Sequence, residues 1–477
     1  MLRRTKIVAT LGPASNDRPV LERMICTGVD VVRLNFSHGT AQDHINRAEL
    51  VRTVAREQGR TVGVLVDLQG PKIRVGKFAD GEITLKAGEN FILDANCALG
   101  NQERVGLDYK ELPQDVGPGD ILLLDDGRLE LTVDRVSGPE VRTTVRQGGV
   151  LSNNKGINRL GGGLTAPALT EKDMEDIKTA ARLQADFLAV SFPRSGMDMA
   201  RASALMTAAG GKAFLIAKIE RAEAIPALEE ILDASDGIMV ARGDLAVEVG
   251  DAAVPALQKK MIRAAQAKNK LVITATQMME SMISSPVPTR AEVSDVANAV
   301  LDGTDAVMLS AETAAGAYPV EAVAAMARVC LEVEKEYGAD MDRTPKTTSD
   351  KLVEESIAQA AVYTTRRMTI RAIAALTHSG RTALLMSRMS TNVPIYAMTP
   401  LEETQRRVTL FRGVYPLPFE QLHSDPEALL NEAQDELRRH KFVKNGDYII
   451  LTIGEPLGKA GGTNTLKIVK VGEHRSA

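Results

Sequence analysis

Eight short apolar segments, separated by segments with helical spacing, constrain the fold of this chain more than any other feature. The segments are TKIVATLG, DVVRLNFS, TVGVLVDL, DFLAVSF, FLIAKIE, GIMVARGD, LVITATQM and AVMLSAET. Continuous apolar runs of this kind are typical of parallel strands that are buried on both faces. Intervening stretches such as 170–184 and 254–268 place apolar residues at helical spacing. The pattern predicts an α/β protein built on a closed (β/α)8 barrel of the TIM type, and an open doubly wound sheet is the alternative.

One interval in this pattern is far too long for an ordinary loop. Roughly 95 residues separate Leu68 from Thr165, whereas most connections in α/β units are much shorter. The interval is rich in glycine and contains alternating runs such as GEITLKAGENFIL and LELTVDRV, which predict short strands. We therefore expect an inserted all-β lid domain at 69–165, with hinges at QGPKIR and GGGLTAP.

The barrel domain is then expected to comprise residues 1–68 and 166–340. A polar stretch, DRTPKTTSDK, follows and is interpreted as a linker. After it come a helical pattern at 351–369 and three apolar runs, AIAALTHSG, VPIYAMTP and DYIILTIG. Residues 341–477 are therefore predicted to form a C-terminal α/β domain.

Composition excludes several classes of protein. The net charge is −4 and no long basic stripe is present, which argues against a nucleic-acid partner. No apolar stretch approaches the length of a membrane span, so no membrane partner is expected. The three cysteines, Cys26, Cys97 and Cys330, form no disulfide or metal pattern, which favours a reducing, cytoplasmic location. The start, MLRRTKIVATLG, has too short an apolar run for a signal peptide.

Polar side chains gather where several of the predicted strands end. Catalytic groups of such barrels come from the carboxyl ends of several strands at once. A solvated strand end or an ion pair explains any one of these residues, but explains the whole set poorly. The residues are Arg33, Asn35 and Ser37 on the second strand, Asp67 on the third, Lys218 and Glu220 on the fifth, Arg242 and Asp244 on the sixth, and Thr276 near the end of the seventh.

The carboxylates of Glu220 and Asp244 end neighbouring strands and are expected to face one pocket. Two carboxylates, completed by water and substrate oxygens, suit Mg²⁺. A carboxyl pair that shares a proton, or that pairs with Lys218 and Arg242, is the alternative. Together with Arg33, these cations predict an anionic, phosphorylated substrate. A P-loop is excluded, because the segment GEPLGKAGGT does not have the required spacing.

Five longer motifs carry a family resemblance. They are RLNFSHG, DLQGPKIR, AKIE, ARGDLAVE and TATQMMESM. With these motifs, which follow one another along the barrel, the chain resembles pyruvate kinase, here without an N-terminal extension. The resemblance implies a mobile lid, a C-terminal effector or interface domain and a homotetramer. It also implies a phosphotransferase of the alcohol-group acceptor class, which converts phosphoenolpyruvate and ADP to pyruvate and ATP in the last step of glycolysis.

The resemblance also implies roles for individual residues. Lys218, Arg33 and Thr276 match catalytic positions, and the same three with Gly243 and Asp244 match the substrate site. Mg²⁺, for which Mn²⁺ can substitute, is expected on Glu220 and Asp244. The remaining matches are Asn35, His38, Arg74 and Lys155 for the nucleotide, and Asn35, Ser37, Asp67 and Leu68 for a monovalent cation.

Two positions depart from the common pattern of the family. Leu68 stands where a threonine is common, and Lys72 stands where a glutamate is common. Because a fixed ammonium repels a nearby K⁺ ion, we predict that activity does not require K⁺. The alternative is that Lys72 turns outward, pairs with a surface acid and leaves the K⁺ site functional. The segment THSGRTA (377–383) partly resembles a loop that binds a phosphorylated effector, so such a ligand is also expected.

Two other functions remain as alternatives. A Mg²⁺-dependent pyruvate or oxaloacetate lyase on the same barrel would also use two carboxylates and an arginine. It would not need Lys218 or the inserted lid with Lys155, and these features favour phosphoryl transfer. A non-catalytic binding protein is disfavoured, because the residues at all the matched catalytic positions are retained.

Overall fold

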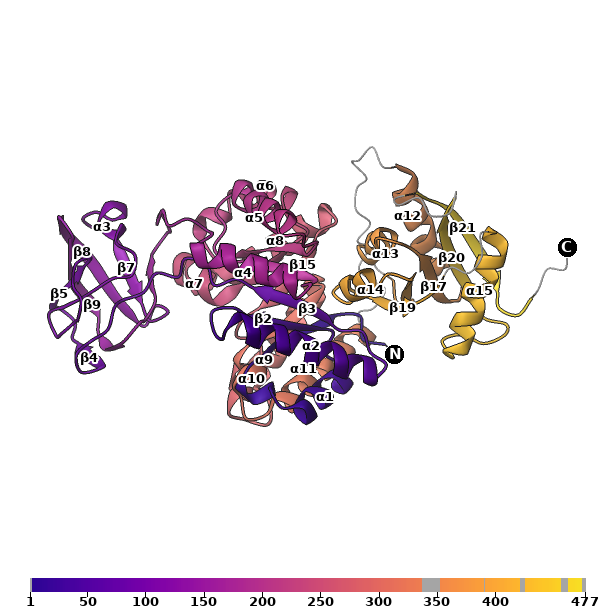
Figure 1. Cartoon of the computed structure of the whole chain (residues 1–477), viewed down its shortest axis with the longest axis horizontal. Helices are drawn as coiled ribbons and strands as arrows, with labels where there is room; N and C mark the ends of the chain where they lie inside the picture. Colours follow the sequence, from indigo (N-terminus) through magenta and orange to yellow (C-terminus); the bar gives the residue numbers. More distant parts are fainter. Residues whose placement is uncertain (1, 337–351, 390, 421–424, 456–461, 474–477) are drawn as a thin grey trace.

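The computed structural model describes residues 2–336, 352–389, 391–420, 425–455 and 462–473. The stretch expected to be a linker, DRTPKTTSDK, lies outside these residues. The molecule has three parts in a row, with the barrel in the middle, the 69–165 segment at one end and the C-terminal part at the other (Figure 1). Among the described residues, none of the helices is both long enough and apolar enough to cross a membrane.

Eight parallel strands close the barrel in the order β1-β16-β15-β14-β13-β12-β3-β2. Each of the eight apolar segments forms one of them, so the closed barrel is confirmed and the open sheet is wrong. The strands are β1 (Lys6–Leu11), β2 (Val31–Asn35), β3 (Gly63–Asp67), β12 (Phe187–Val190), β13 (Phe214–Ile219), β14 (Gly237–Ala241), β15 (Leu271–Ala275) and β16 (Ala306–Leu309).

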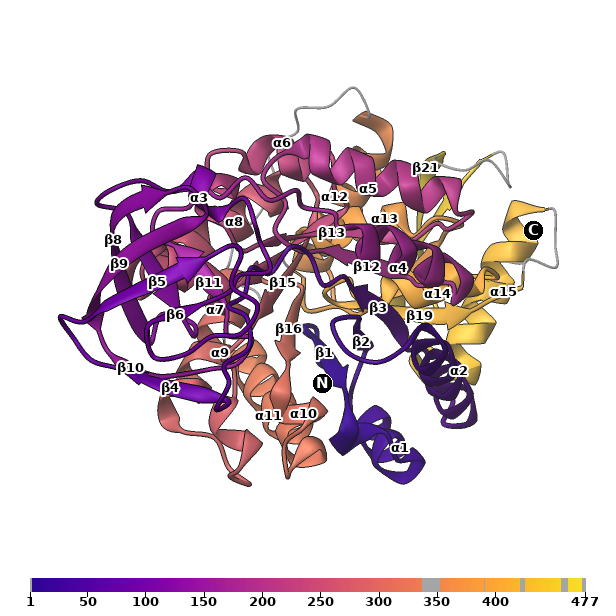
Figure 2. The same cartoon turned by 60° about the vertical axis from the view of Figure 1, so that its left-hand side comes forward.

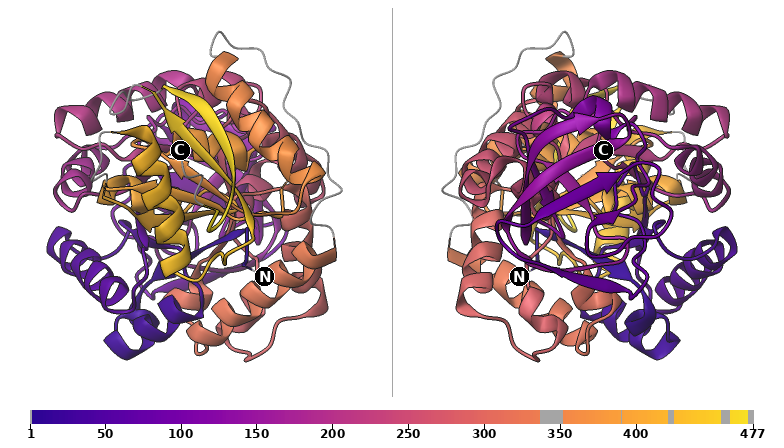
Figure 3. Two further views of the ribbon diagram at one scale, coloured as in Figure 1. Left: turned by 90° about the vertical axis from the view of Figure 1, so that its right-hand side faces the viewer. Right: turned by 90° about the vertical axis from the view of Figure 1, so that its left-hand side faces the viewer.

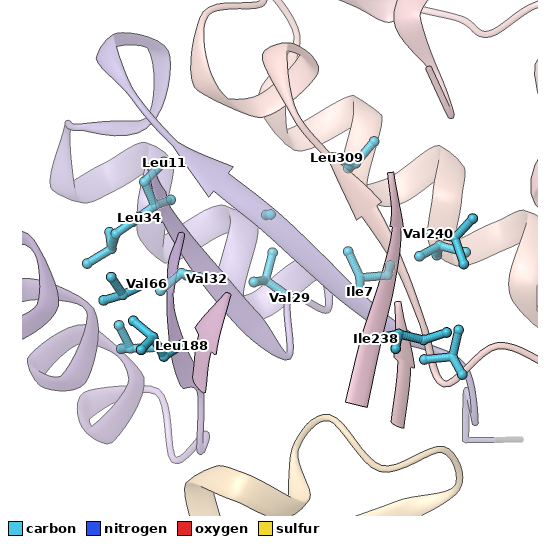
Figure 4. Close-up of a cluster of buried hydrophobic side chains, with 14 of the residues drawn as sticks. Ile7, Leu11, Val29, Val32, Leu34, Val66, Leu188, Ile238, Val240 and Leu309 are labelled. Carbon is cyan, nitrogen blue, oxygen red and sulfur yellow. The ribbon is translucent and has the colours of Figure 1, made fainter. Parts of the chain in front are cut away.

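Successive side chains of each barrel strand point alternately to the helices and into the barrel. On β1, Ile7 belongs to the apolar layer under the helices and Val8 to the barrel interior. Figure 4 shows part of the outer layer, including Val32, Leu34 and Val66. Burial on both faces explains why the strands are apolar runs rather than alternating ones.

Helices cover the outside of the barrel. Three of them, α2, α4 and α9, begin at capping boxes in which a threonine, namely Thr40, Thr170 or Thr289, exchanges hydrogen bonds with the residue three positions later. The helices are α1 (Arg18–Thr27), α2 (Ala41–Glu57), α4 (Glu171–Arg182), α5 (Gly196–Ala208), α6 (Leu228–Asp233), α7 (Arg242–Val249), α8 (Val254–Ala267), α9 (Arg290–Asp302), α10 (Ala311–Ala314) and α11 (Pro319–Glu336).

The segment between β3 and β12 is built almost entirely of strands. It forms a sheet of order β11-β7-β8-β9-β5-β6 and a two-stranded sheet of β10 and β4. These sheets have a core of their own and lie beyond one end of the barrel (Figures 1 and 2). The elements are β4 (Glu82–Leu85), β5 (Asn90–Asp94), β6 (Arg104–Val105), α3 (Leu112–Asp115), β7 (Ile121–Leu124), β8 (Leu129–Ser137), β9 (Glu140–Gln147), β10 (Gly149–Ser152) and β11 (Ile157–Arg159).

The C-terminal part is a five-stranded sheet of order β19-β18-β17-β20-β21 with helices around it. It lies at the end of the molecule opposite the 69–165 segment (Figures 1 and 3). The three predicted strands are β17, β18 and β20, whereas β19 and β21 were not predicted. The elements are α12 (Leu352–Arg367), β17 (Ile370–Leu376), α13 (Arg381–Ser387), β18 (Ile395–Thr399), α14 (Glu402–Val408), β19 (Val414–Pro418), α15 (Pro426–Arg439), β20 (Tyr448–Gly454) and β21 (Thr463–Lys470).

Buried polar contacts join the C-terminal part to the end of the barrel at which the strands begin. The guanidinium of Arg388 makes two hydrogen bonds with the carboxylate of Asp305, and both side chains are almost fully buried. Nε of Arg406 lies 2.9 Å from Oδ1 of Asp186. The fully buried Lys6 donates from Nζ to the carbonyl of Val414 at 2.6 Å. The opposite mouth of the barrel therefore remains for the site.

Candidate active site

Arg33, Asp67 and Lys218 meet inside the open mouth of the barrel. They come from β2, β3 and β13, each two residues after an inward-facing apolar residue, as the two-residue period of a strand requires. Nε of Arg33 lies 2.6 Å from Oδ2 of Asp67, and Nζ of Lys218 lies 3.3 Å from Oδ1 of the same carboxylate. Three of the strand ends predicted to converge, those of β2, β3 and β13, converge here.

The charges of this group stabilise one another. Burial alone would raise the pKa of Asp67, but the ammonium of Lys218 and the guanidinium of Arg33 outweigh burial and hold that pKa below its usual range. Burial would likewise lower the pKa of Lys218, but the carboxylates of Asp67 and Glu220 outweigh it and raise the pKa. Lys218 therefore carries a permanent positive charge at neutral pH.

Glu220 follows β13 directly and lies next to Lys218. Its Oε1 is 2.8 Å from Nζ of Lys218, and its Oε2 accepts a hydrogen bond from the backbone N–H of Phe192 at 3.0 Å. Only 1% of the surface of Glu220 is exposed to solvent. Burial, together with the like charge of Asp244, raises the pKa of Glu220 above its usual value. The ionised form of Glu220 therefore depends on a cation beside it, a part that Lys218 plays here.

Asp244 lies in the first turn of α7, the helix that begins where β14 ends. Nζ of Lys72 is 3.2 Å from its Oδ1, and the same ammonium is 3.8 Å from Oδ1 of Asp126 in the 69–165 segment. Lys72 therefore does not simply turn out to solvent; it joins the inserted segment to the barrel mouth.

Glu220 and Asp244 fit a divalent cation that keeps water and substrate ligands. Within the described ranges, no group of three or more His, Cys, Asp and Glu side chains is placed to hold a metal. Mg²⁺ is commonly bound by only one or two carboxylates plus water and substrate phosphates. The ammonium groups now beside these carboxylates, those of Lys218 and Lys72, mark the negative charge that such an ion would neutralise.

Arg242, expected to add positive charge to the mouth, does not do so. Its guanidinium lies 2.6 Å from Oδ2 of Asp295 on α9 and donates at 2.7 Å to the carbonyl of Thr276. The side chain is 10% exposed. Arg242 is the first residue of α7, and its side chain points away from the barrel axis. It contacts the connection between β15 and α9 instead.

Thr276, whose carbonyl accepts the hydrogen bond from Arg242, has an unusual backbone conformation. Its φ is +66°, in the left-handed region that β-branched residues rarely adopt. Its hydroxyl donates to the carbonyl of Ala275 at 2.6 Å and accepts from the N–H of Gly243 at 2.8 Å. Thr276 therefore holds the start of α7, where Gly243 precedes Asp244. Backbone strain of this kind gathers at functional sites.

The residues expected to hold a monovalent cation lie near the same group. Oδ1 of Asn35 accepts from the N–H of Ser37 at 3.1 Å. Asp67 is paired with Arg33, as described above. The carbonyl of Leu68 accepts from the hydroxyl of Ser191 at 2.7 Å. These oxygens are gathered on the β2 and β3 side of the mouth.

The expected nucleotide contacts His38, Arg74 and Lys155 lie further out. Nζ of Lys155 is 2.7 Å from Oδ1 of Asp125, and Arg74 donates to the carbonyl of Asn154 at 2.9 Å. Both belong to the 69–165 segment, whereas the exposed His38 follows β2. Arg74 and Lys155 thus contact the inserted segment rather than the group around Lys218.

Ser191 and Phe192 were not predicted as site residues. They follow β12, the fourth barrel strand, which contributed no charged residue to the sequence pattern. The signal was available, because Phe187, Ala189 and Ser191 alternate toward the barrel axis. A hydroxyl at that position does not stand out among charged residues.

Comparisons with known proteins match nearly the whole chain. A family model described as "Pyruvate kinase, barrel domain" matches residues 2–323, and one described as "Pyruvate kinase, alpha/beta domain" matches residues 355–469. Pyruvate kinase II of Salmonella typhimurium is 54% identical over 476 residues, covering 98% of this chain and 99% of the relative. The pyruvate kinase of Haemophilus influenzae is 55% identical over 459 residues, covering 95% and 96%.

A solved structure agrees with these matches. A pyruvate kinase from Cryptosporidium parvum superposes with a TM-score of 0.91 at 34% identity, covering 98% of this chain and 96% of that chain. The likeness therefore extends across the barrel, the inserted sheets and the C-terminal sheet. Together with the convergent strand ends, these matches show that the chain belongs to the pyruvate kinase family.

Proposed function

We propose that this chain transfers the phosphoryl group of phosphoenolpyruvate to ADP and releases pyruvate and ATP. The observation that carries the proposal is the pair Lys218–Glu220, which places a permanent cation and a buried carboxylate 2.8 Å apart at the mouth of the barrel. Phosphoryl transfer needs little covalent chemistry from the protein, and positioning and charge stabilisation dominate. In the terms of enzyme classes, the proposal is a phosphotransferase with an alcohol-group acceptor.

The proposed metal site consists of Glu220 and Asp244, which would hold Mg²⁺ or Mn²⁺. When bound, the ion would supply Lewis-acid stabilisation of negative charge on substrate oxygens. Lys218 would neutralise charge on the transferring phosphoryl group, and Arg33, held by Asp67, would contact the same group. A lysine suits this role, because its ammonium is a compact point charge on a flexible stem.

The carboxylate of phosphoenolpyruvate is proposed to bind at the start of α7. The first backbone N–H groups of a helix have no partner within the helix and favour an anion. Here they are those of Gly243 and Asp244. The N–H of Gly243 donates to the hydroxyl of Thr276 at 2.8 Å, and the substrate carboxylate would share or replace that bond. Thr276 is also the residue we propose to lie on the path of the proton that converts the enolate to pyruvate.

The nucleotide is proposed to bind between the barrel mouth and the 69–165 segment. His38 and Asn35 would contribute from the barrel side, and Arg74 and Lys155 from the inserted sheets. This assignment rests on treating residues 69–165 as a lid domain, residues 1–68 and 166–340 as the catalytic domain, and residues 341–477 as an effector or interface domain. The glycines at 161–163, all with positive φ, support a hinge.

Activity is proposed not to require K⁺. The oxygens of Asn35, Ser37, Asp67 and Leu68 are retained, but the ammonium of Lys72 supplies a fixed positive charge within the mouth. A K⁺ ion within ~4 Å of that ammonium would be repelled by several kcal/mol at an effective dielectric near 20, and we propose that the two positive charges compete for the mouth.

A phosphorylated effector, a homotetramer and a cytoplasmic location complete the proposal. The loop 377–383 presents hydroxyls and backbone N–H groups at the start of α13; Thr377, for example, accepts from the N–H of Gly380 at 2.9 Å. In the sheet that the described residues form, β21 is an edge strand, a position at which a second copy could pair. The three cysteines are all free, which suits a reducing compartment.

The test is a coupled assay for ATP formation from phosphoenolpyruvate and ADP with Mg²⁺. The lyase alternative is tested in parallel by following the cleavage of oxaloacetate without nucleotide. ATP formation that is lost in Glu220→Gln supports the proposal. Cleavage without ATP formation would establish the lyase instead.

A further inference from the structure

The fourth barrel strand, β12, ends in a sharp turn made by Ser191 and Phe192. Phe192 has a φ of +56°, which is costly for a bulky residue and persists only where the surroundings hold it. Gly70, in the first hinge of the inserted segment, packs against the turn; a Cβ atom there would lie 2.6 Å from Cβ of Ser191. The turn is therefore fixed between the hinge and the barrel.

The hydroxyl of Ser191, which is 1% exposed, binds the ammonium of Lys218 at 2.8 Å. The other two neighbours of that ammonium are Oε1 of Glu220 at 2.8 Å and Oδ1 of Asp67 at 3.3 Å. A lysine has three N–H donors, and these three oxygens match them. The carbonyl of Leu68 can only accept, so the hydroxyl proton of Ser191 points to it at 2.7 Å and a lone pair faces Lys218.

The same turn also holds the neighbouring carboxylate. The N–H of Phe192 donates to Oε2 of Glu220 at 3.0 Å. Two consecutive residues of one strand end therefore contact both members of the Lys218–Glu220 pair, Ser191 through its side chain and Phe192 through its backbone.

We propose that Ser191 is a positioning residue for phosphoryl transfer, acting through Lys218. The carboxylates of Asp67 and Glu220 hold the ammonium of Lys218 through opposite charge as well as through hydrogen bonds. The neutral hydroxyl of Ser191, by contrast, sets the direction of one N–H without cancelling positive charge, so the charge of the ammonium can still act on the phosphoryl group. The inference rests on the proposed function and names a residue beyond those assigned to it above.

The test is a double-mutant cycle in the full-length chain, with Ser191→Ala and Lys218→Met alone and together. Loss of a hydrogen bond to a charged group should lower kcat of Ser191→Ala about tenfold or more, while KM for phosphoenolpyruvate stays within about threefold. In the Lys218→Met background the same substitution should lower kcat less than about twofold, because the group that Ser191 positions is absent.

Two further variants and one binding measurement make the test specific. Ser235→Ala is the matched control, since this buried serine donates only to the carbonyl of Ile231 at 2.7 Å, ahead of β14 and away from the mouth. Its kcat should stay within about twofold of the parent. Ser191→Cys keeps the size of the side chain and replaces Ser191→Ala if that variant does not fold. Mn²⁺ affinity, measured by electron paramagnetic resonance, should be unchanged in Ser191→Ala, because the N–H of Phe192 still holds Glu220.

Each remaining outcome contradicts the inference. A kcat for Ser191→Ala within twofold of the parent, additive losses in the cycle, or loss of Mn²⁺ affinity would overturn the role of Ser191 and leave the proposed function standing. A parent chain that forms no ATP would overturn the proposed function, and the inference with it.

Discussion

Nζ of Lys72 lies 3.2 Å from Oδ1 of Asp244, so a residue of the first lid hinge contacts a proposed metal ligand of the barrel. The same ammonium is 3.8 Å from Asp126 in the inserted sheets. Lys72 therefore places a positive charge inside the mouth and also joins the barrel to the lid. Both properties lead to experiments.

The first prediction concerns monovalent cations. In tetramethylammonium buffer free of K⁺ the chain should be active, and added K⁺ should change kcat less than tenfold, or about 1.4 kcal/mol. Lys72→Glu combined with Leu68→Thr should create a K⁺ requirement, because it replaces the ammonium at position 72 with a carboxylate and adds a hydroxyl at position 68. Lys77→Glu, an exposed change of the same charge in the same segment, serves as the control. A parent that K⁺ activates tenfold or more rules the prediction out.

The second prediction concerns lid movement. With Mg²⁺ and nucleotide bound, the 69–165 segment should rotate as a rigid body about its glycine hinges and close over the barrel. Small-angle X-ray scattering should show a smaller radius of gyration with ligands than without them. The movement must break or rebuild the contact of Lys72 with Asp244 of the barrel. An unchanged radius at saturating ligand would argue against a mobile lid.

The third prediction concerns pH and Glu248 of α7. Burial, with the like charge of Glu223, raises the pKa of Glu248 from 4.5 to about 7. Between pH 4.5 and about pH 7 the folded state therefore keeps the proton of Glu248, which the unfolded state releases. The stabilisation that this bound proton gives the folded state is complete below pH 4.5 and is lost as the pH rises through 7. The total is on the order of 3 kcal/mol.

Glu248→Gln should remove that pH dependence. Glutamine keeps an oxygen that can accept from the N–H of Ala222, which lies 2.8 Å from Oε2 of Glu248. Urea unfolding of parent and variant at pH 5.5 and pH 8 measures the effect, and the variant should gain stability relative to the parent at pH 8. The same difference in stability at both pH values would show that Glu248 titrates normally.

The fourth prediction concerns the contact between the barrel and the C-terminal part. Arg388→Met should lower the free energy of unfolding by about 3 kcal/mol, because it leaves Asp305 buried without its cation. This value is at the lower end of the losses expected when one partner of a buried ion pair is removed, because the N–H groups of Val272 and Arg412 still donate to the carboxylate of Asp305. Thermal and urea unfolding measure it. A loss below about 1 kcal/mol would mean that water reaches the carboxylate.

The barrel could be predicted from the sequence because burial on both faces leaves a continuous apolar run for every strand. The strands β19 and β21 could not be predicted, since β19 contains Pro416 and Pro418 at a sheet edge and β21 is a largely polar edge strand. Edge strands are less constrained by burial, so their sequences carry a weaker signal.

The convergence of Arg33, Asp67 and Lys218 follows from strand period and strand order, and both can be predicted. The direction of Arg242 could not be predicted, because its partner Asp295 lies on a helix about 50 residues later and no local pattern links them. Ser191 was missed for a different reason: its role depends on the lysine it contacts, and its hydroxyl has no signature of its own.

The central claim is that Lys218 stabilises the transferring phosphoryl group while Glu220 and Asp244 hold the metal. The most direct measurement is kcat for ATP formation from phosphoenolpyruvate and ADP in the parent and in Lys218→Met, with Lys178→Met on the surface of α4 as the control and Mn²⁺ affinity measured in each. We predict that Lys218→Met lowers kcat roughly 10²-fold or more and leaves Mn²⁺ affinity largely intact, as expected for loss of a transition-state charge donor. A Lys218→Met variant with nearly the parent's kcat would contradict the account.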